Sequence, residues 1–113
     1  MATIREMVRS IQKEVRDTPD LLPDRACVLL NQLTALICNI GDELIVADLE
    51  YKRVLLECLR ENKAANRARI EAETTPQFVR RQEAIHLEKF AVEMIRSLKI
   101  TIKSKEEEMR LAR

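Results

Sequence analysis

The chain has 113 residues, 46% of them hydrophobic, and a formal net charge of +1, which is typical of one folded domain and excludes disorder by composition. Aromatic residues make up 3% of the chain, glycine occurs once and tryptophan is absent. β-Sandwiches and barrels need many turn residues and aromatic or β-branched strands, so this composition excludes them and favours long helices. We therefore expect a single all-α domain over residues 1–113.

The first predicted helix runs from about residue 3 to 16. Thr3 and Glu6 have the spacing of a capping box. Two prolines in the segment DTPDLLPD, residues 17–24, end the helix because proline is not tolerated in a helix interior. One side of the segment carries apolar residues at helical spacing: Ile4, Met7, Val8, Ile11 and Val15.

The second predicted helix runs unbroken from about residue 24 to 73, a length of roughly 75 Å. Its apolar residues follow a heptad seam from Ala26 to Ala72, and only Glu61 interrupts that seam. Gly41 lies inside the helix, where it is about 1 kcal/mol less favourable than alanine. The long periodicity on both sides is expected to offset this.

The third predicted helix runs from about residue 76 to 111. Thr75 is expected to be its N-cap, and Pro76 fits the first helical position because its missing N–H is harmless there. The break at Thr74–Pro76 is predicted to be the turn of a long antiparallel hairpin, with the first helix at the opposite end. Folding there predicts the following facing pairs: Ala65 with Ala84, Cys58 with Ala91, Tyr51 with Leu98, and Ile40 with Met109.

A second apolar stripe lies on the side of the second helix that faces away from the third. A hairpin buries one face of each helix, so a stripe of this size would be unusual in water. We therefore predict a homo-oligomer, a dimer or higher, that forms a helical bundle. The alternative is that the first helix and loop 17–23 fold along the stripe. The predicted self-association residues are Cys38, Ile45, Leu49, Leu56 and Leu59.

Signals of catalysis and of ligand binding are weak. The chain lacks the phosphate-binding glycine motifs and the G-x-S-x-G motif. His86 is the single histidine, and its neighbours Glu83 and Glu93 only weakly resemble a metal site. The cysteines at 27, 38 and 58 form no C-x-x-C motif and are expected to be buried apolar side chains in a reducing compartment. We expect no enzyme, no catalytic residue, no cofactor and no metal.

Basic residues form rows on the predicted helix surfaces, and such rows can follow a phosphate backbone. A simpler interpretation is that these residues form ion pairs within a helix, such as Lys89 with Glu93. Aromatic residues that could stack on bases are scarce. The predicted nucleic-acid contacts are Arg80, Arg81, Lys89, Arg96, Lys99 and Lys103.

Two segments, ADLEYKRVL at residues 47–55 and IRSLKITIKSKEEEM at residues 95–109, carry a resemblance. Together with the alanine-rich region between them, they resemble the small helical-hairpin proteins that bacteriophage genomes encode, some of them near replication and recombination genes. The resemblance covers residues 40–110 and implies a phage or prokaryotic protein that is accessory to DNA transactions. It assigns no catalytic residue.

The N-terminal segment MATIREMVRS carries charge every few residues, unlike a signal peptide. No run approaches ~18 apolar residues, so we expect no membrane contact and a cytoplasmic location. The predicted function is a non-enzymatic helical interaction and oligomerisation module with a protein partner. The alternative is a nucleic-acid-binding accessory protein that contacts the phosphate backbone.

Overall fold

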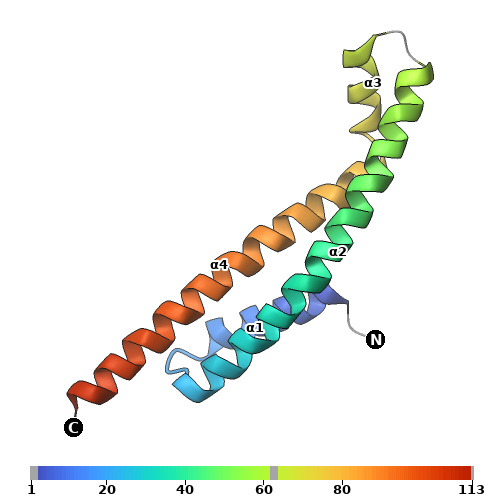
Figure 1. Ribbon diagram of the computed structural model, residues 1–113. Coiled ribbons are helices and arrows are strands. Elements are labelled where there is room, and N and C mark those ends of the chain that lie inside the picture. The colour runs from blue at the N-terminus through green and yellow to red at the C-terminus, as the bar shows by residue number, and fades with distance from the viewer. Residues whose placement is uncertain (1–2, 62–63, 113) are drawn as a thin grey trace. The chain divides into compact units, whose positions relative to one another are not determined.

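The computed structural model describes residues 3–61 and 64–112, and these residues form four helices without a strand. The predicted all-α class is confirmed, and the two long helices α2 and α4 pack against each other as a helical hairpin (Figure 1). The helices are α1 (Ile4–Asp17), α2 (Pro23–Glu61), α3 (Ala65–Ala72) and α4 (Pro76–Leu111).

Residue contacts divide the chain into two compact units, and both long helices contribute to each of them. The first unit comprises Met1–Asn39 and Lys89–Arg113, and the second comprises Ile40–Glu88. The expectation of a single domain over residues 1–113 stays a prediction.

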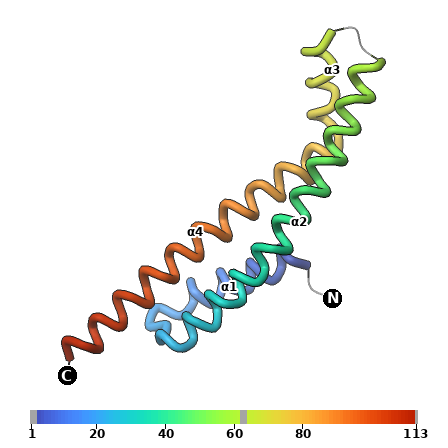
Figure 2. Tube along the Cα trace, in the orientation of Figure 1, coloured from blue at the N-terminus to red at the C-terminus, as the bar shows by residue number. Residues whose placement is uncertain are grey.

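In the first unit, α1 lies beside the beginning of α2 (Figure 2). The predicted capping box starts α1: the Glu6 N–H donates to Thr3 Oγ1 at 3.2 Å, and the Thr3 N–H donates to Glu6 Oε2 at 3.4 Å. Arg25 of α2 donates to Glu14 of α1, with Nη2 and Oε1 2.7 Å apart. The core of this unit is aliphatic, and its buried side chains are Val8, Ile11, Leu21, Ala26, Leu29, Leu33, Leu36, Ala91 and Leu98.

The prediction of one unbroken helix from 24 to 73 is wrong. Helix α2 ends at Glu61, and Ala64 has an extended backbone (φ −100°, ψ 121°) immediately before α3 begins at Ala65. Residues 62 and 63 of the predicted helix lie outside the described residues. Glu61 is the residue that interrupts the heptad seam, and a helix without an apolar residue facing its neighbour loses the packing that stabilises it.

The chain reverses direction between α2 and α3 and not at Thr74–Pro76 as predicted. In the second unit, burial and then the nearby Glu71 carboxylate of α3 raise the pKa of the Cys58 thiol of α2, and the centroid of the Phe78 ring of α4 lies 5.4 Å from that of the Tyr51 ring. Successive residues of α3 and α4 therefore meet successively earlier residues of α2.

This reversal changes the register of the hairpin. Tyr51 packs against Phe78 and not against Leu98 as predicted, a shift of more than five helical turns along α4. Ala65, predicted to face Ala84, is exposed.

The break before Pro76 joins two helices that both return along α2. The hydroxyls of Thr74 and Thr75 donate to the carbonyls of Glu71 and Ala72 at 2.7 and 2.6 Å, which satisfies acceptors at the end of α3. The Phe78 N–H donates to Thr75 Oγ1 at 3.4 Å, so Thr75 caps α4 as predicted.

Small residues fill the interior of the second unit. The methyl side chains of Ala47, Ala68, Ala72 and Ala84 are buried, which allows helix backbones to approach closely.

One described helix, α2, is long and apolar enough to cross a membrane when judged by length and composition alone. Its most apolar stretch has a mean hydropathy of 1.2, and 17% of that stretch is buried. Core helices of soluble proteins meet the same criterion, so the expected absence of membrane contact stays a prediction.

Candidate self-association surface

In the second unit, the Arg81 side chain of α4 contacts both a carboxylate and an aromatic ring of α2 and thereby aligns the two helices. Arg81 Nε donates to Asp48 Oδ1 at 2.7 Å, and the Arg81 guanidinium lies 5.4 Å from the centroid of the Tyr51 ring. The Phe78 ring packs on the same tyrosine. A planar guanidinium suits both a carboxylate and an aromatic face, so one side chain connects two positions of α2 that lie about one turn apart.

The Asp48 carboxylate accepts hydrogen bonds from the side chains of both Lys52 and Arg81. Lys52 Nζ lies 2.9 Å from Asp48 Oδ2, while Arg81 bonds the other carboxylate oxygen. These hydrogen bonds, first from Lys52 and then from Arg81, hold the pKa of the Asp48 carboxyl below its ordinary value of 3.8. The Asp48 side chain is 29% exposed, which limits screening by solvent.

Arg80 makes a second link between the same helices. Its guanidinium donates to Glu43 Oε1 at 2.8 Å and to Glu50 Oε2 at 2.7 Å, and these carboxylates raise its pKa above the ordinary value, Glu43 more strongly. Exposed ion pairs contribute little energy individually. Together, however, the two arginines fix which residues of α4 face α2.

These contacts turn one face of α2 toward α3 and α4 and leave the opposite face open. Ile40 and Ala47 are buried on the covered face. On the open face lie four large apolar side chains, which we call the outer stripe. Its members, with their exposed fractions, are Ile45 (61%), Leu49 (52%), Leu56 (49%) and Leu59 (41%).

The outer stripe contains four of the five predicted self-association residues. All four are exposed and belong to the second unit, whereas the first helix and loop 17–23 belong to the first, so the alternative in which these segments cover the stripe stays open. Cys38 is also exposed and belongs to the first unit. Cys27 is exposed as well, so the expectation of buried cysteines fails at both positions.

The six predicted nucleic-acid contacts are divided between the two units. Arg80 and Arg81 belong to the second unit and bind carboxylates of α2, so they serve the fold. Lys89, Arg96, Lys99 and Lys103 belong to the first unit.

Ion pairs also occupy part of the α4 surface. In place of the predicted pair of Lys89 with Glu93, Arg96 bonds Glu93 at 3.1 Å. Within residues 3–61 and 64–112, the exposed side chains of Lys89, Lys99 and Lys103 have no ion-pair partner.

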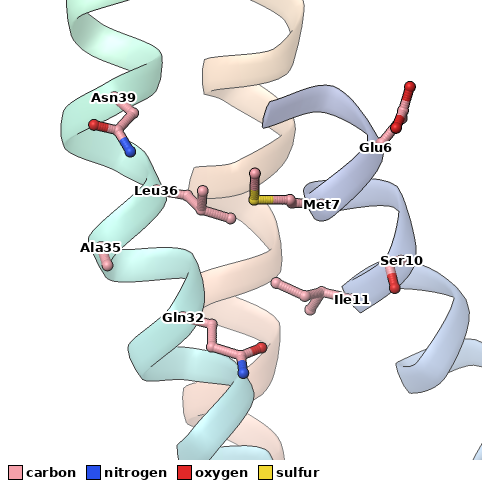
Figure 3. A pocket seen from close by; sticks show the side chains of 8 residues that line it. All are labelled: Glu6, Met7, Ser10, Ile11, Gln32, Ala35, Leu36 and Asn39. Atoms are coloured by element: carbon pink, nitrogen blue, oxygen red, sulfur yellow. The ribbon is translucent and has the colours of Figure 1, made fainter. Parts of the chain in front are cut away.

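A groove between α1 and α2 in the first unit is a feature that the sequence reasoning missed. It has a volume of about 510 Å³, and Met7, Ile11 and Leu36 point toward one another across it (Figure 3). Met7 was predicted on the apolar stripe of the first helix but is 39% exposed, because α1 and α2 do not close over it. Polar side chains border the groove: Glu6, Ser10, Gln32 and Asn39.

The structure adds no support for catalytic or metal chemistry. His86 is exposed on α4. Over the described ranges 3–61 and 64–112, no group of three or more His, Cys, Asp and Glu residues could hold a metal ion. The expectation that the protein is not an enzyme stays a prediction.

Comparison with known proteins found no match: no family model, no curated protein and no solved structure matches the chain. The resemblance to phage hairpin proteins and the cytoplasmic location therefore stay predictions.

We predict that Asp48→Asn lowers the free energy of unfolding by about 0.5–1 kcal/mol at neutral pH, after solvent screening. The folded-state pKa of Asp48 lies below the unfolded value, so its contribution is full above the ordinary carboxyl pKa of 3.8 and is lost as the pH falls further. Urea unfolding followed by circular dichroism at neutral pH and near pH 3 measures this difference.

The matched control is Asp20→Asn, which changes an exposed aspartate in the loop between α1 and α2. It is expected to leave the urea midpoint unchanged. Equal midpoints for Asp48→Asn and the parent at neutral pH would show that the Asp48 contacts do not stabilise the fold.

Proposed function

We propose that the protein is a non-enzymatic helical interaction module that assembles with further copies of itself through the outer stripe. The supporting observation is that Ile45, Leu49, Leu56 and Leu59 remain exposed on α2 although α3 and α4 pack on the opposite face. No other described helix of the second unit covers them.

The energetics favour a covered stripe. Burying a leucine or isoleucine side chain completely contributes roughly 1.5–3 kcal/mol of stabilisation. The four side chains of the outer stripe are about half exposed, so covering them would add about half of that free energy for each. Contiguous apolar patches of this kind on soluble chains mark interaction sites. A second copy of the chain supplies the same surface, so a two-fold symmetric contact covers both stripes at once.

A second candidate function is contact with a nucleic-acid backbone through α4. Its support is that Lys99 and Lys103 are exposed and have no ion-pair partner in the described part of the chain. The engagement of Arg80 and Arg81 with carboxylates of α2 counts against the wider surface. Self-association is therefore the stronger proposal.

For self-association, we expect the parent chain to sediment as a dimer or larger species at tens of micromolar. The double variant Leu49→Glu/Leu56→Glu is expected to sediment as a monomer, because two charges per chain would be buried without a partner in the contact. Sedimentation velocity gives both results directly.

Ile70→Glu/Val79→Glu is the matched control, since Ile70 and Val79 are exposed apolar residues of the same unit outside the outer stripe. This variant should keep the parent's oligomeric state. A monomeric parent chain at these concentrations would contradict the proposed function.

The second candidate predicts that a labelled DNA duplex is retarded in a gel at low salt and released steeply as salt rises. Retardation should be lost in Arg96→Glu/Lys99→Glu/Lys103→Glu and kept in Arg67→Glu/Arg69→Glu, a change of exposed arginines on α3. A parent chain that fails to retard the duplex at low salt removes this candidate.

A further inference from the structure

Four exposed residues of α2 have a spacing that is the same from either end and carry opposite charges at the two ends. Asp42, Ile45, Leu49 and Lys52 follow one another at spacings of three, four and three residues, which keeps them on one side of a helix. Their order is acid, apolar, apolar, base. All four are exposed, and the two apolar members belong to the outer stripe.

The two charged residues differ in their surroundings. Asp42 has no hydrogen bond or ion pair among residues 3–61 and 64–112, although it adjoins an apolar stripe. Lys52 bonds Asp48 within the helix, yet its side chain remains 66% exposed. One end of the pattern thus offers an unpaired carboxylate, and the other end offers an accessible ammonium.

We propose that a second copy docks antiparallel on the outer stripe, with Asp42 of each copy against Lys52 of the other and Ile45 of each against Leu49 of the other. This inference rests on the proposed self-association and specifies its partner, direction and register. A two-fold axis perpendicular to the helices generates two identical ion pairs around an apolar centre.

Charge complementarity selects this arrangement over the alternatives. A parallel pair in register places Asp42 against Asp42 and Lys52 against Lys52, and like charges across an interface are strongly unfavourable. A shifted antiparallel pair with Ile45 against itself places Asp42 against Leu49. That register leaves the carboxylate facing an apolar side chain without a partner.

The size of the contact also fits a second long helix better than a short peptide. A stable interface buries on the order of 1,000 Å² or more, which exceeds what four side chains provide. Leu56 and Leu59 extend the apolar surface toward the end of α2, which has 39 residues. A partner helix of the same length can cover them together with the central pattern.

Charge reversal tests the pairing. We expect Asp42→Lys to raise the dimer dissociation constant at least ~tenfold, because it places a lysine against Lys52 of the other copy. The double variant Asp42→Lys/Lys52→Asp is expected to return the dissociation constant to within about threefold of the parent value. Asp42→Lys is the cleaner single variant, because Lys52 also bonds Asp48 within the chain.

Cysteine cross-linking tests the register independently of charge. In a chain with Cys27, Cys38 and Cys58 changed to Ser, one preparation carries Ile45→Cys and another carries Leu49→Cys. Oxidation of the mixture is expected to link the two kinds of chain, while each preparation alone stays unlinked. Circular dichroism confirms that each variant keeps its helices.

The outcomes separate this inference from the proposed function. If the parent is a monomer, both fail. If the parent dimerises and Leu49→Glu/Leu56→Glu disrupts it, but Asp42→Lys leaves the dissociation constant unchanged, self-association stands and the antiparallel pairing is overturned. Efficient linking of either single-cysteine preparation with itself also overturns the pairing, because it indicates a parallel or shifted register.

Discussion

The contact of Arg81 with Asp48 and Tyr51 is the constraint on which the arrangement of the second unit depends. It joins α4 to α2 through a carboxylate and an aromatic face at once, and Arg80 adds links to Glu43 and Glu50. Apolar helix faces slide past one another at modest cost, whereas these polar contacts are satisfied in one register only. The buried alanines then fill the space between the helices.

The same constraint produces the surface that we connect with function. Once α3 and α4 occupy one face of α2, Ile45 and Leu49 on the other face remain more than half exposed. The arginines that hold the fold are thereby removed from the basic rows, which weakens a nucleic-acid function at the same time. The charged side chains of the second unit thus determine which helix faces meet within the chain. We propose that Asp42 and Lys52 do the same between two copies.

The sequence predicted the helices better than it predicted their pairing. Local signals were sufficient for α1, with its Thr3–Glu6 capping box, and for the start of α4 at Thr75–Pro76. The reversal was assigned to the wrong break, because proline ends a helix but also fits the first position of the next one. The chain reverses direction between the end of α2 at Glu61 and the start of α3 at Ala65. In the sequence, the indication of this break was Glu61 itself, a polar residue in the apolar seam. The outer stripe could be predicted from periodicity, but the ion pairs of Arg80 and Arg81 could not, because they depend on the register.

The register can be measured directly by cross-linking within one chain. In the background with Cys27, Cys38 and Cys58 changed to Ser, one variant carries Tyr51→Cys/Phe78→Cys and a second carries Tyr51→Cys/Leu98→Cys. Oxidation at low concentration, followed by mass spectrometry, should give an intramolecular disulfide in the first variant and none in the second. A disulfide in the second variant without one in the first would show that the chain reverses at Thr74–Pro76, and the outer stripe would then have to be reassigned.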